Sequence, residues 1–375
     1  LLNSKIIGIV ILVIAIGGAS AYFLSKPNTI NSDSLSNQIT LKNEKIGLVI
    51  NTINPPQNID DIEKSYKIAA SSGIGRTNLY VHWDKLEPEK GKFDWRSTDI
   101  MIQLNEKYDL KTTLFFSVIN ADRLGPFPPW MGNQALGETL EEDTIRVLDE
   151  ILSRYDNIDF VIFAGDVDYH FQRATGSIPK YTEFFNNVSS KIKSNHPNVK
   201  IGNTLSLENV LNKGMQPGGS FELTPQLTMG DFIGLSYKPT DVVGDINKTP
   251  EESIQDIERI FDIFPSQKIA FFEISWSTST FVNGNNDDQA QFIKSSLDFF
   301  EKNESEIEFF TISRLFDKPK GSCVSLNIEK IPGSSFASNE FRLERVDEYV
   351  CNSGLIDKNE NTKPSWSQLK ANISK

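Results

Sequence analysis

The chain has 375 residues, which is enough for two ordinary domains or for one large α/β barrel. Its composition, 38% hydrophobic and 23% charged, is that of a folded globular protein and excludes wholesale disorder. The formal net charge of −12 argues against nucleic acid as a partner, because phosphate binding requires a surplus of Lys and Arg. Two cysteines and three histidines leave little for a metal centre.

An uncharged apolar segment near the N-terminus runs from Ile6 to Leu24. A bilayer-spanning helix needs about 20 such residues, whereas the apolar part of a signal peptide has about 7–15. The length favours an uncleaved signal anchor over residues 1–26, with a long signal peptide cleaved near residues 18–21 as the alternative. Both interpretations predict an exported protein, either anchored to the outside of the cell membrane or secreted.

A polar linker over residues 27–43, rich in Asn and Ser, separates this segment from the rest of the chain. We expect residues 44–375 to form the folded domain. Export permits a disulfide, and Cys323 and Cys351 are the two cysteines of the chain. A bridge between them is the prediction, and two separate buried thiols are the alternative.

Short apolar segments rich in β-branched and aromatic residues predict eight strands, which begin at Lys45, Ile74, Lys111, Ile158, Val199, Asp231, Lys268 and Ile307. Between successive starts there is room for one helix and two loops. Continuous apolar runs are typical of strands that are buried on both faces, as in a parallel sheet. Eight such β-α units predict a closed (β/α)8 TIM barrel. A doubly wound open sheet is the alternative, but no glycine-rich phosphate loop follows the first strand.

Three of the intervening helices have clear start signals. One begins at Asp60 and extends to Ala70. Another begins with Thr249 as the cap, followed by a proline and two glutamates, and a third begins at Asn286. Acidic residues in a first turn favour a helix because they lie at the positive end of its dipole.

Two carboxylates lie where a barrel of this kind places its functional residues, at the C-terminal ends of strands. Asp166 ends the fourth predicted strand, and Glu273 interrupts the otherwise apolar seventh. Two carboxylates that face each other across a barrel mouth can hydrolyse a glycosidic bond, because one protonates the leaving oxygen while the other attacks or activates water. A structural ion pair of Glu273 with Arg76, and a cap or loop role for Asp166, are the alternatives.

Further polar and aromatic residues near the strand ends are candidates for binding a carbohydrate. The predicted binding residues are Arg76, His82, Trp83, Asp168, Tyr169, Tyr237 and Trp276. Asp168 lies two residues after Asp166, so an extended strand would point both to one face. Core packing is the alternative for each aromatic residue. His82 and His170 are expected to form hydrogen bonds or pack, without binding metal.

Four segments in this order, WDKLEPEKGKFDW, DFIGLSYKP, FFEISWSTS and GLIDKNENTKPSW, resemble segments of clan A glycoside hydrolases. These are (β/α)8 retaining enzymes that include β-galactosidases, xylanases, cellulases and endo-galactanases. The resemblance spans about Lys45 to Lys370 and implies Glu273 as nucleophile, Tyr237 as its supporting tyrosine and Arg76 as the arginine of strand two. It also implies that no cofactor is needed, since these enzymes use only carboxylates and water.

The fourth strand departs from the pattern of this clan. The usual Asn-Glu pair, as in GNEVD, is AGDVD here, so Gly165 replaces the Asn and Asp166 replaces the acid/base Glu. A side chain shorter by one methylene withdraws its carboxyl by about 1 Å, and such a displacement can lower a rate on the order of a hundredfold. We predict a monomeric, exported glycoside hydrolase acting on an extracellular glycan, with Glu273 as nucleophile and Asp166 as acid/base. The alternative is a catalytically impaired barrel that binds carbohydrate or serves the cell envelope.

Overall fold

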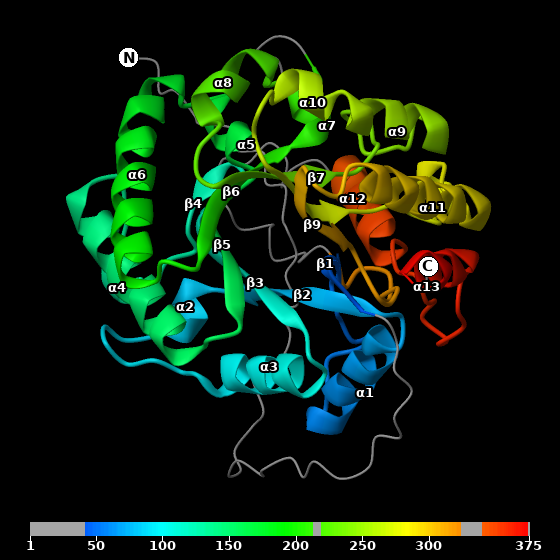
Figure 1. The fold of residues 1–375 in the computed structure, drawn as a ribbon, viewed down its shortest axis with the longest axis horizontal. Helices are drawn as coiled ribbons and strands as arrows, with labels where there is room; N and C mark the ends of the chain where they lie inside the picture. Colours follow the sequence, from blue (N-terminus) through cyan, green and yellow to red (C-terminus); the bar gives the residue numbers. More distant parts are fainter. Residues whose placement is uncertain (1–41, 213–218, 324–339, 374–375) are drawn as a thin grey trace.

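A computed structural model describes residues 42–212, 219–323 and 340–373. Eight parallel strands close into a barrel, because β1 pairs with both β2 and β9 and the other strands pair in chain order (Figure 1). They are β1 Asn43–Leu48, β2 Ile74–Val81, β3 Lys111–Asn120, β5 Ile158–Gly165, β6 Lys200–Ser206, β7 Phe232–Tyr237, β8 Ile269–Ile274 and β9 Ile307–Ile312. The short strand β4, Arg123–Leu124, pairs antiparallel with the end of β3. The eight predicted strands and the closed barrel are confirmed, and the open-sheet alternative is excluded.

Helices surround this barrel (Figure 1). The α helices are α1 Ile59–Ala70, α2 Trp83–Leu86, α3 Arg96–Lys107, α4 Glu138–Arg154, α5 Val167–Phe171, α6 Ile178–Asn195, α7 Leu207–Val210, α8 Thr224–Leu227, α9 Pro250–Glu258, α10 Ile260–Ile263, α11 Asn286–Lys302, α12 Glu340–Cys351 and α13 Pro364–Ile373. In the described part of the chain, the 3₁₀ turns are η1 Pro129–Met131, η2 Thr175–Ser177, η3 Phe221–Leu223 and η4 Thr280–Val282. The last helix, α13, packs on α11 and closes the helical layer near β1.

The expected start signals act as helix caps. Asn58 accepts a hydrogen bond from the amide of Asp61 at 3.0 Å and so begins α1. Thr249 and Glu252 form a reciprocal capping box at α9. Asn285, one residue before the predicted start, caps α11. These side chains satisfy amide groups that a helix leaves without partners in its first turn.

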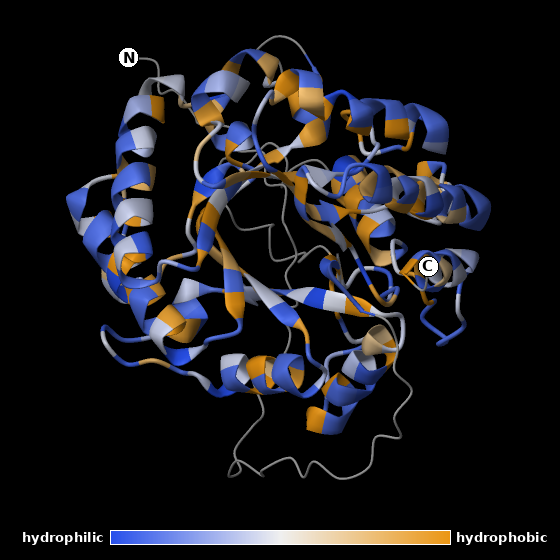
Figure 2. Cartoon of the chain, viewed as in Figure 1, coloured by the Kyte–Doolittle hydropathy of each residue, from blue (hydrophilic) through white to orange (hydrophobic). Residues whose placement is uncertain are grey.

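Two apolar layers hold the fold together. One fills the barrel itself and consists of Phe115, Phe160, Ile162, Phe232, Ala270, Phe272 and Phe309. The other lies between the outer faces of the strands and the apolar faces of the helices. Figure 2 shows the corresponding alternation of hydrophobic and hydrophilic residues along α4, α6 and α11. The predicted continuous apolar strands are thus explained, because side chains on both faces are buried.

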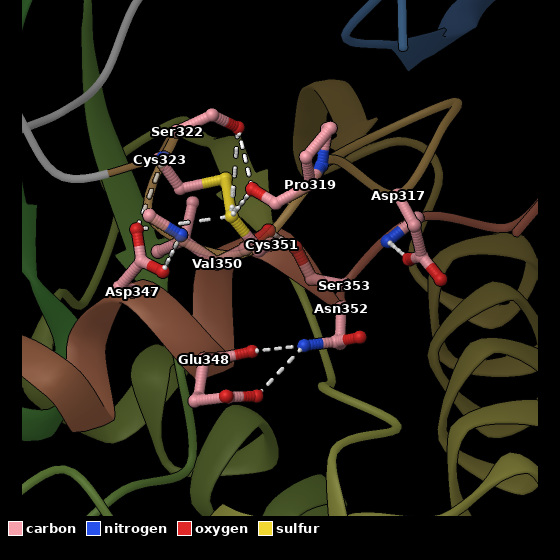
Figure 3. Close-up of a disulfide and its surroundings, with 12 residues drawn as sticks. Asp317, Pro319, Ser322, Cys323, Asp347, Glu348, Val350, Cys351, Asn352 and Ser353 are labelled. Atoms are coloured by element: carbon pink, nitrogen blue, oxygen red, sulfur yellow. Dashed lines mark hydrogen bonds between the residues drawn. A yellow bond between two sulfur atoms is a disulfide. The ribbon is translucent and has the colours of Figure 1, made fainter. Parts of the chain in front are cut away.

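The predicted bridge between Cys323 and Cys351 is confirmed, with a Cα–Cα distance of 5.5 Å (Figure 3). It joins the segment after β9 to the end of α12. Asp347, one turn earlier in α12, accepts hydrogen bonds from the amides of Cys323 at 3.0 Å and Gly321 at 2.5 Å. The same side chain therefore orders the backbone that carries one half of the bridge.

The predicted signal anchor, residues 1–26, and the linker as far as residue 41 lie outside the described residues. Among the helices that the structure does describe, none combines the length and the hydropathy needed to cross a bilayer.

Candidate active site

Glu273 lies near the C-terminal end of β8, at the barrel mouth, by which we mean the end where the eight parallel strands finish. Its side chain is partly exposed, whereas the neighbouring strand residues are buried. The hydroxyl of Tyr80, near the end of β2, donates a hydrogen bond to Oε1 of Glu273. Asn78 supports this arrangement, because its Nδ2 donates to the Phe272 carbonyl at 2.9 Å and to the Tyr80 hydroxyl at 3.3 Å. Glu273 is therefore fixed in orientation while part of it remains accessible.

A cation lies beside this pair. Arg314 follows β9 and is buried, and its charge interacts with both Glu273 and Tyr80. Burial lowers the pKa of Arg314, and the charge of Glu273 opposes that effect. Burial, followed by the negative charge of Glu273, raises the pKa of Tyr80 well above its usual value, so Tyr80 remains a proton donor at neutral pH. The surroundings of Glu273 thus supply one hydrogen-bond donor and one positive charge.

Asp166 follows β5 directly and lies, like Glu273, at the barrel mouth. Its Oδ1 accepts hydrogen bonds from the hydroxyls of Ser236 at 2.8 Å and Thr204 at 3.0 Å. Ser236, on β7, is paired in register with Glu273 on β8. The structure therefore brings the two predicted catalytic carboxylates together with one serine between them. Burial raises the pKa of Asp166, and the charge of Glu273 raises it further.

The glycine that replaces the usual asparagine of the clan has a steric explanation. A Cβ atom on Gly165 would lie 2.6 Å from Cε2 of Phe115, which is far inside van der Waals contact. The Phe115 ring stacks on Phe272 and also contacts Tyr80, with centroid distances of 5.4 and 5.7 Å. The ring thus occupies the position where an asparagine side chain would begin.

The side chains of Asp168 and Asp166 do not point to the same face, contrary to the prediction. The chain turns at Asp166, which has a φ of 45°, and Asp168 is already in α5. The alternation of an extended strand therefore no longer applies. Asp168 is fully buried and accepts hydrogen bonds from the Ser206 amide, Asn209 Nδ2 and Ser220 Oγ. It anchors the segment after β6, and burial raises its pKa to about 7.

The resemblance implied that Tyr237 supports Glu273. It does not, because its side chain points away from the barrel interior. Its hydroxyl donates to Asp256 of α9 at 2.9 Å. The preceding residue, Ser236, takes the inward position next to Glu273. Tyr80 is therefore the tyrosine that contacts the predicted nucleophile.

The two tryptophans predicted to bind a sugar are buried in the outer core. Trp83 packs against Phe116 and donates to Glu87 Oε2 at 2.9 Å. Trp276 packs against Phe292 of α11. Neither ring has an accessible face. Both tryptophans therefore serve in core packing, which was the alternative to sugar binding.

Arg76 lies at the opposite end of the barrel from the mouth, at the start of β2. Its buried guanidinium forms an ion pair with the partly exposed Asp159 at 2.8 Å and lies between the rings of Phe160 and Phe309. It also donates to the Glu44 carbonyl at 2.7 Å. The predicted substrate-binding role is therefore corrected to a structural one, and the suggested Glu273–Arg76 ion pair does not form.

The remaining predicted residues do lie near the mouth. Tyr169 is largely buried and its hydroxyl is 3.3 Å from Ser206 Oγ. His82 follows β2 and is partly exposed; burial lowers its pKa, which keeps the ring neutral. His170 Nδ1 is 3.1 Å from the Asp122 carbonyl. Within residues 42–212, 219–323 and 340–373, only Cys323, Asp347 and Cys351 have the spacing of metal ligands, and the two sulfurs are bonded to each other.

Three residues of this site were not predicted from the sequence, Tyr80, Arg314 and Glu208. Tyr80 shares the inward face of β2 with Arg76 and Asn78, so the period of two could have identified it once the face was known. Glu208 follows β6 by two residues. Both Arg314 and Glu208 lie just beyond strand ends, where a barrel places its functional groups.

No family model matches the chain, and no curated protein matches it in sequence. Solved structures nevertheless share its fold. A GH5_18 protein from Bifidobacterium longum subsp. longum, in complex with Manβ1-4GlcNAc, superposes with a TM-score of 0.64 at 12% identity, over 88% of this chain and 78% of that chain. The exo-β-1,4-mannosidase Op5Man5 from Opitutaceae bacterium strain TAV5 gives 0.62 at 14% identity, over 92% of this chain and 62% of that chain.

A family 39 glycoside hydrolase from Bacteroides cellulosilyticus WH2 gives a TM-score of 0.56 at 14% identity, over 89% of this chain and 64% of that chain. At such low identity these likenesses concern the fold. They confirm the resemblance to clan A (β/α)8 glycoside hydrolases at that level and leave the family within the clan open.

Proposed function

We propose that this protein is a glycoside hydrolase whose nucleophile is Glu273. The observation that carries the proposal is the position of this carboxylate. It is partly exposed at the barrel mouth, accepts a hydrogen bond from Tyr80 and lies near a second acidic group, Asp166. The fold shared with glycoside hydrolases supports the proposal. Fold alone does not specify function, so the argument rests on the side chains.

In the proposed reaction, one oxygen of Glu273 attacks the anomeric carbon while the glycosidic oxygen leaves. Tyr80 donates a hydrogen bond to the other oxygen, and Arg314 supplies a positive charge beside it. A protonated carboxyl group on the β5–β6 side of the mouth gives its proton to the leaving oxygen. The sequence prediction assigns that second role to Asp166, whose raised pKa favours the protonated form.

We propose a neutral β-linked glycan outside the cell as the substrate. The acidic surface, with a net charge of −12, suits an uncharged ligand better than an anionic one. One protein of the same fold binds Manβ1-4GlcNAc and another is an exo-β-1,4-mannosidase, so β-mannosides are the first substrates to test. The disulfide and the apolar segment before the barrel support export, with either a membrane tether or secretion.

A panel of aryl β-glycosides, including the β-mannoside, and of β-linked polysaccharides tests the proposal. The wild type should release aryl alcohol or reducing ends, and Glu273→Gln should lose at least about a thousandfold in kcat, since removal of a nucleophile leaves only binding effects. Glu308→Gln is the matched control. Glu308 lies near the start of β9 and pairs with Lys200, so this variant should keep its activity. Equal turnover by wild type and Glu273→Gln would exclude the assignment.

A carbohydrate-binding barrel without hydrolysis is the second candidate. It is favoured by the Phe115 ring, which fills the space of the usual asparagine beside Gly165. Calorimetry with the same oligosaccharides separates the two functions. Binding without any release of reducing ends between pH 4 and 8 would support the second candidate.

A further inference from the structure

Asp166 is poorly suited to deliver a proton to a leaving group. A general acid must reach the leaving oxygen at hydrogen-bond distance and hold its proton near the working pH. The Asp166 side chain is only 3% exposed, and its Oδ1 already accepts hydrogen bonds from Thr204 and Ser236. These contacts tie it to β6 and β7. It is also one methylene shorter than a glutamate.

Glu208 lies at the barrel mouth directly after β6, as the second residue of α7. Thr204 and Ser206 point inward, since Thr204 contacts Asp166 and Ser206 contacts Tyr169. Glu208 is partly exposed, and its charge interacts with those of Asp166 and Lys238. Ser206 is paired with Ser236, which in turn is paired with Glu273. Glu208 therefore lies just beyond a row of paired residues that leads directly to the proposed nucleophile.

One oxygen of Glu208 lacks a partner. Oε2 is buried and accepts no hydrogen bond, even though a buried polar atom without a partner is costly. By contrast, the nearby Asp168 carboxylate accepts hydrogen bonds from the Ser206 amide, Asn209 and Ser220. Oε2 of Glu208 therefore has hydrogen-bonding capacity that the described protein groups do not use.

We propose that Glu208 is the general acid and base of this site and that Asp166 is a positioning residue. The inference rests on the proposed glycoside hydrolase function and changes the assignment of its second carboxylate.

The electrostatic surroundings of Glu208 suit this role. The charged and titratable groups that face it are Lys238 after β7, Asp166, Asp168 and Tyr169 after β5, Tyr237 at the end of β7 and Tyr349 of α12. Burial is the main cause that raises the pKa of Glu208, to about 7, and the charges of Asp166 and Asp168 add to it while Lys238 opposes it. A carboxyl group with such a pKa holds its proton in slightly acidic solution and can take it back after transfer.

The steps balance as follows. The Glu208 proton passes to the glycosidic oxygen as the bond from that oxygen to the anomeric carbon breaks, and Glu273 forms an ester bond to the same carbon. The Glu208 carboxylate then takes a proton from water, whose oxygen bonds to the carbon as the ester bond breaks. Both carboxyl groups return to their starting states, and no further reactant is required.

The test compares Glu208→Gln with Asp166→Asn on two sets of β-glycosides. One set has dinitrophenyl leaving groups, which depart without a proton, and the other has alkyl or sugar leaving groups, which need one. In kcat/KM, which reports the steps up to formation of the ester, Glu208→Gln should lose about a hundredfold or more on the second set and less than tenfold on the first. Its pH–rate profile should also lose the alkaline limb. Asp166→Asn should lose activity by the same factor on both sets and keep that limb. Thermal unfolding checks that each variant folds, and Glu208→Ala serves if Glu208→Gln does not.

The outcomes separate this inference from the proposed function. Selective loss in Asp166→Asn, or an equal loss on both sets in the Glu208 variants, overturns the assignment of Glu208 while hydrolysis itself stands. A wild type that hydrolyses neither set overturns both. Selective loss in a Glu208 variant confirms the assignment.

Discussion

Tyr80 of β2 donates its hydroxyl hydrogen to Glu273 of β8, although β1 and β9 lie between these two strands in the barrel. The tyrosine ring lies over the aromatic filling of the barrel, with its centroid 5.7 Å from that of Phe115 and 5.8 Å from that of Phe272. Packing in the barrel interior therefore determines where along the barrel axis the Tyr80 hydroxyl contacts the Glu273 carboxylate. Packing inside the barrel and orientation of the proposed nucleophile are coupled through one residue.

Replacement of Tyr80 by phenylalanine should lower activity far more than stability. A hydrogen bond to a charged group contributes about 1.5–3 kcal/mol, so kcat/KM should fall roughly 10- to 100-fold. The ring contacts remain, and the melting temperature should change by only a few degrees. Tyr66→Phe is the matched control, since Tyr66 is buried in α1 away from the mouth. Steady-state kinetics of the two variants decide the point, and equal activities would contradict a role for the Tyr80 hydroxyl.

Arg76 should contribute to stability without contributing to substrate binding. Arg76→Met removes the ion pair with the partly exposed Asp159 and the hydrogen bond to the Glu44 carbonyl, at a cost of about 1–3 kcal/mol in the free energy of unfolding. The KM of the folded variant should stay within about twofold of the wild type, because Arg76 lies at the end of the barrel away from the mouth. Arg96→Met is the control, since the ion pair of Arg96 with Asp94 is exposed and should matter little. Denaturant titration and kinetics together test this, and a large rise in KM would restore the substrate-binding role.

The barrel could be predicted from the sequence because its signals are local and repeated. Each apolar segment is long enough for one strand, and helix starts such as Thr249-Pro250 lie between them. Closure into a barrel also follows from the count of eight. The prediction of the cysteine bridge rests on the two cysteines of the chain and on the expectation of export. None of these inferences requires knowing which face of a strand points inward.

The details of the site depend on that choice of face. Ser236 lies on the same face of β7 as Phe232, which fills the barrel, so Tyr237 faces α9. A register shift in the pairing of β7 with β8 passes over Phe272 and places Glu273 opposite Ser236. The backbone of Asp166 has a left-handed conformation, which ends the alternation of inward and outward side chains before Asp168. Such irregularities arise from contacts between strands that are distant in the chain, and short-range patterns do not contain them.

Asp168 should make the protein less stable as the pH rises from about 4 to 7. The carboxyl group is fully buried, and burial raises its pKa to about 7, whereas an aspartate in an unfolded chain has a pKa of about 3.9. The folded state therefore keeps a proton that the unfolded state releases, so the stabilisation is complete below pH 4 and is lost as the pH rises through 7. Between pH 5 and 6 the expected loss is about 1.4 kcal/mol per pH unit.

Asp168→Asn removes this titration while preserving the shape of the side chain. Its free energy of unfolding, measured in urea from pH 5 to 8, should fall less steeply than that of the wild type by about the same 1.4 kcal/mol per unit near pH 5.5. Asp287→Asn, on the exposed first turn of α11, is the control and should leave the slope unchanged. Parallel curves for the wild type and Asp168→Asn would show that Asp168 is ionised in the folded protein.

The bridge between Cys323 and Cys351 should stabilise the C-terminal part of the barrel. The two cysteines are 28 residues apart in sequence, and a loop of that length contributes about 3–4 kcal/mol on the chain-entropy estimate. In a domain of this size, that corresponds to a decrease of roughly 5 °C in melting temperature for the double variant Cys323→Ser/Cys351→Ser. Reduction of the wild type with dithiothreitol should produce the same decrease, and reduction of the double variant should produce none. Among the described residues, neither cysteine is a hydrogen-bond partner of Glu273 or Tyr80, so kcat at 25 °C should remain within about twofold. A larger loss of kcat would mean that the segment joined by the bridge helps to shape the barrel mouth.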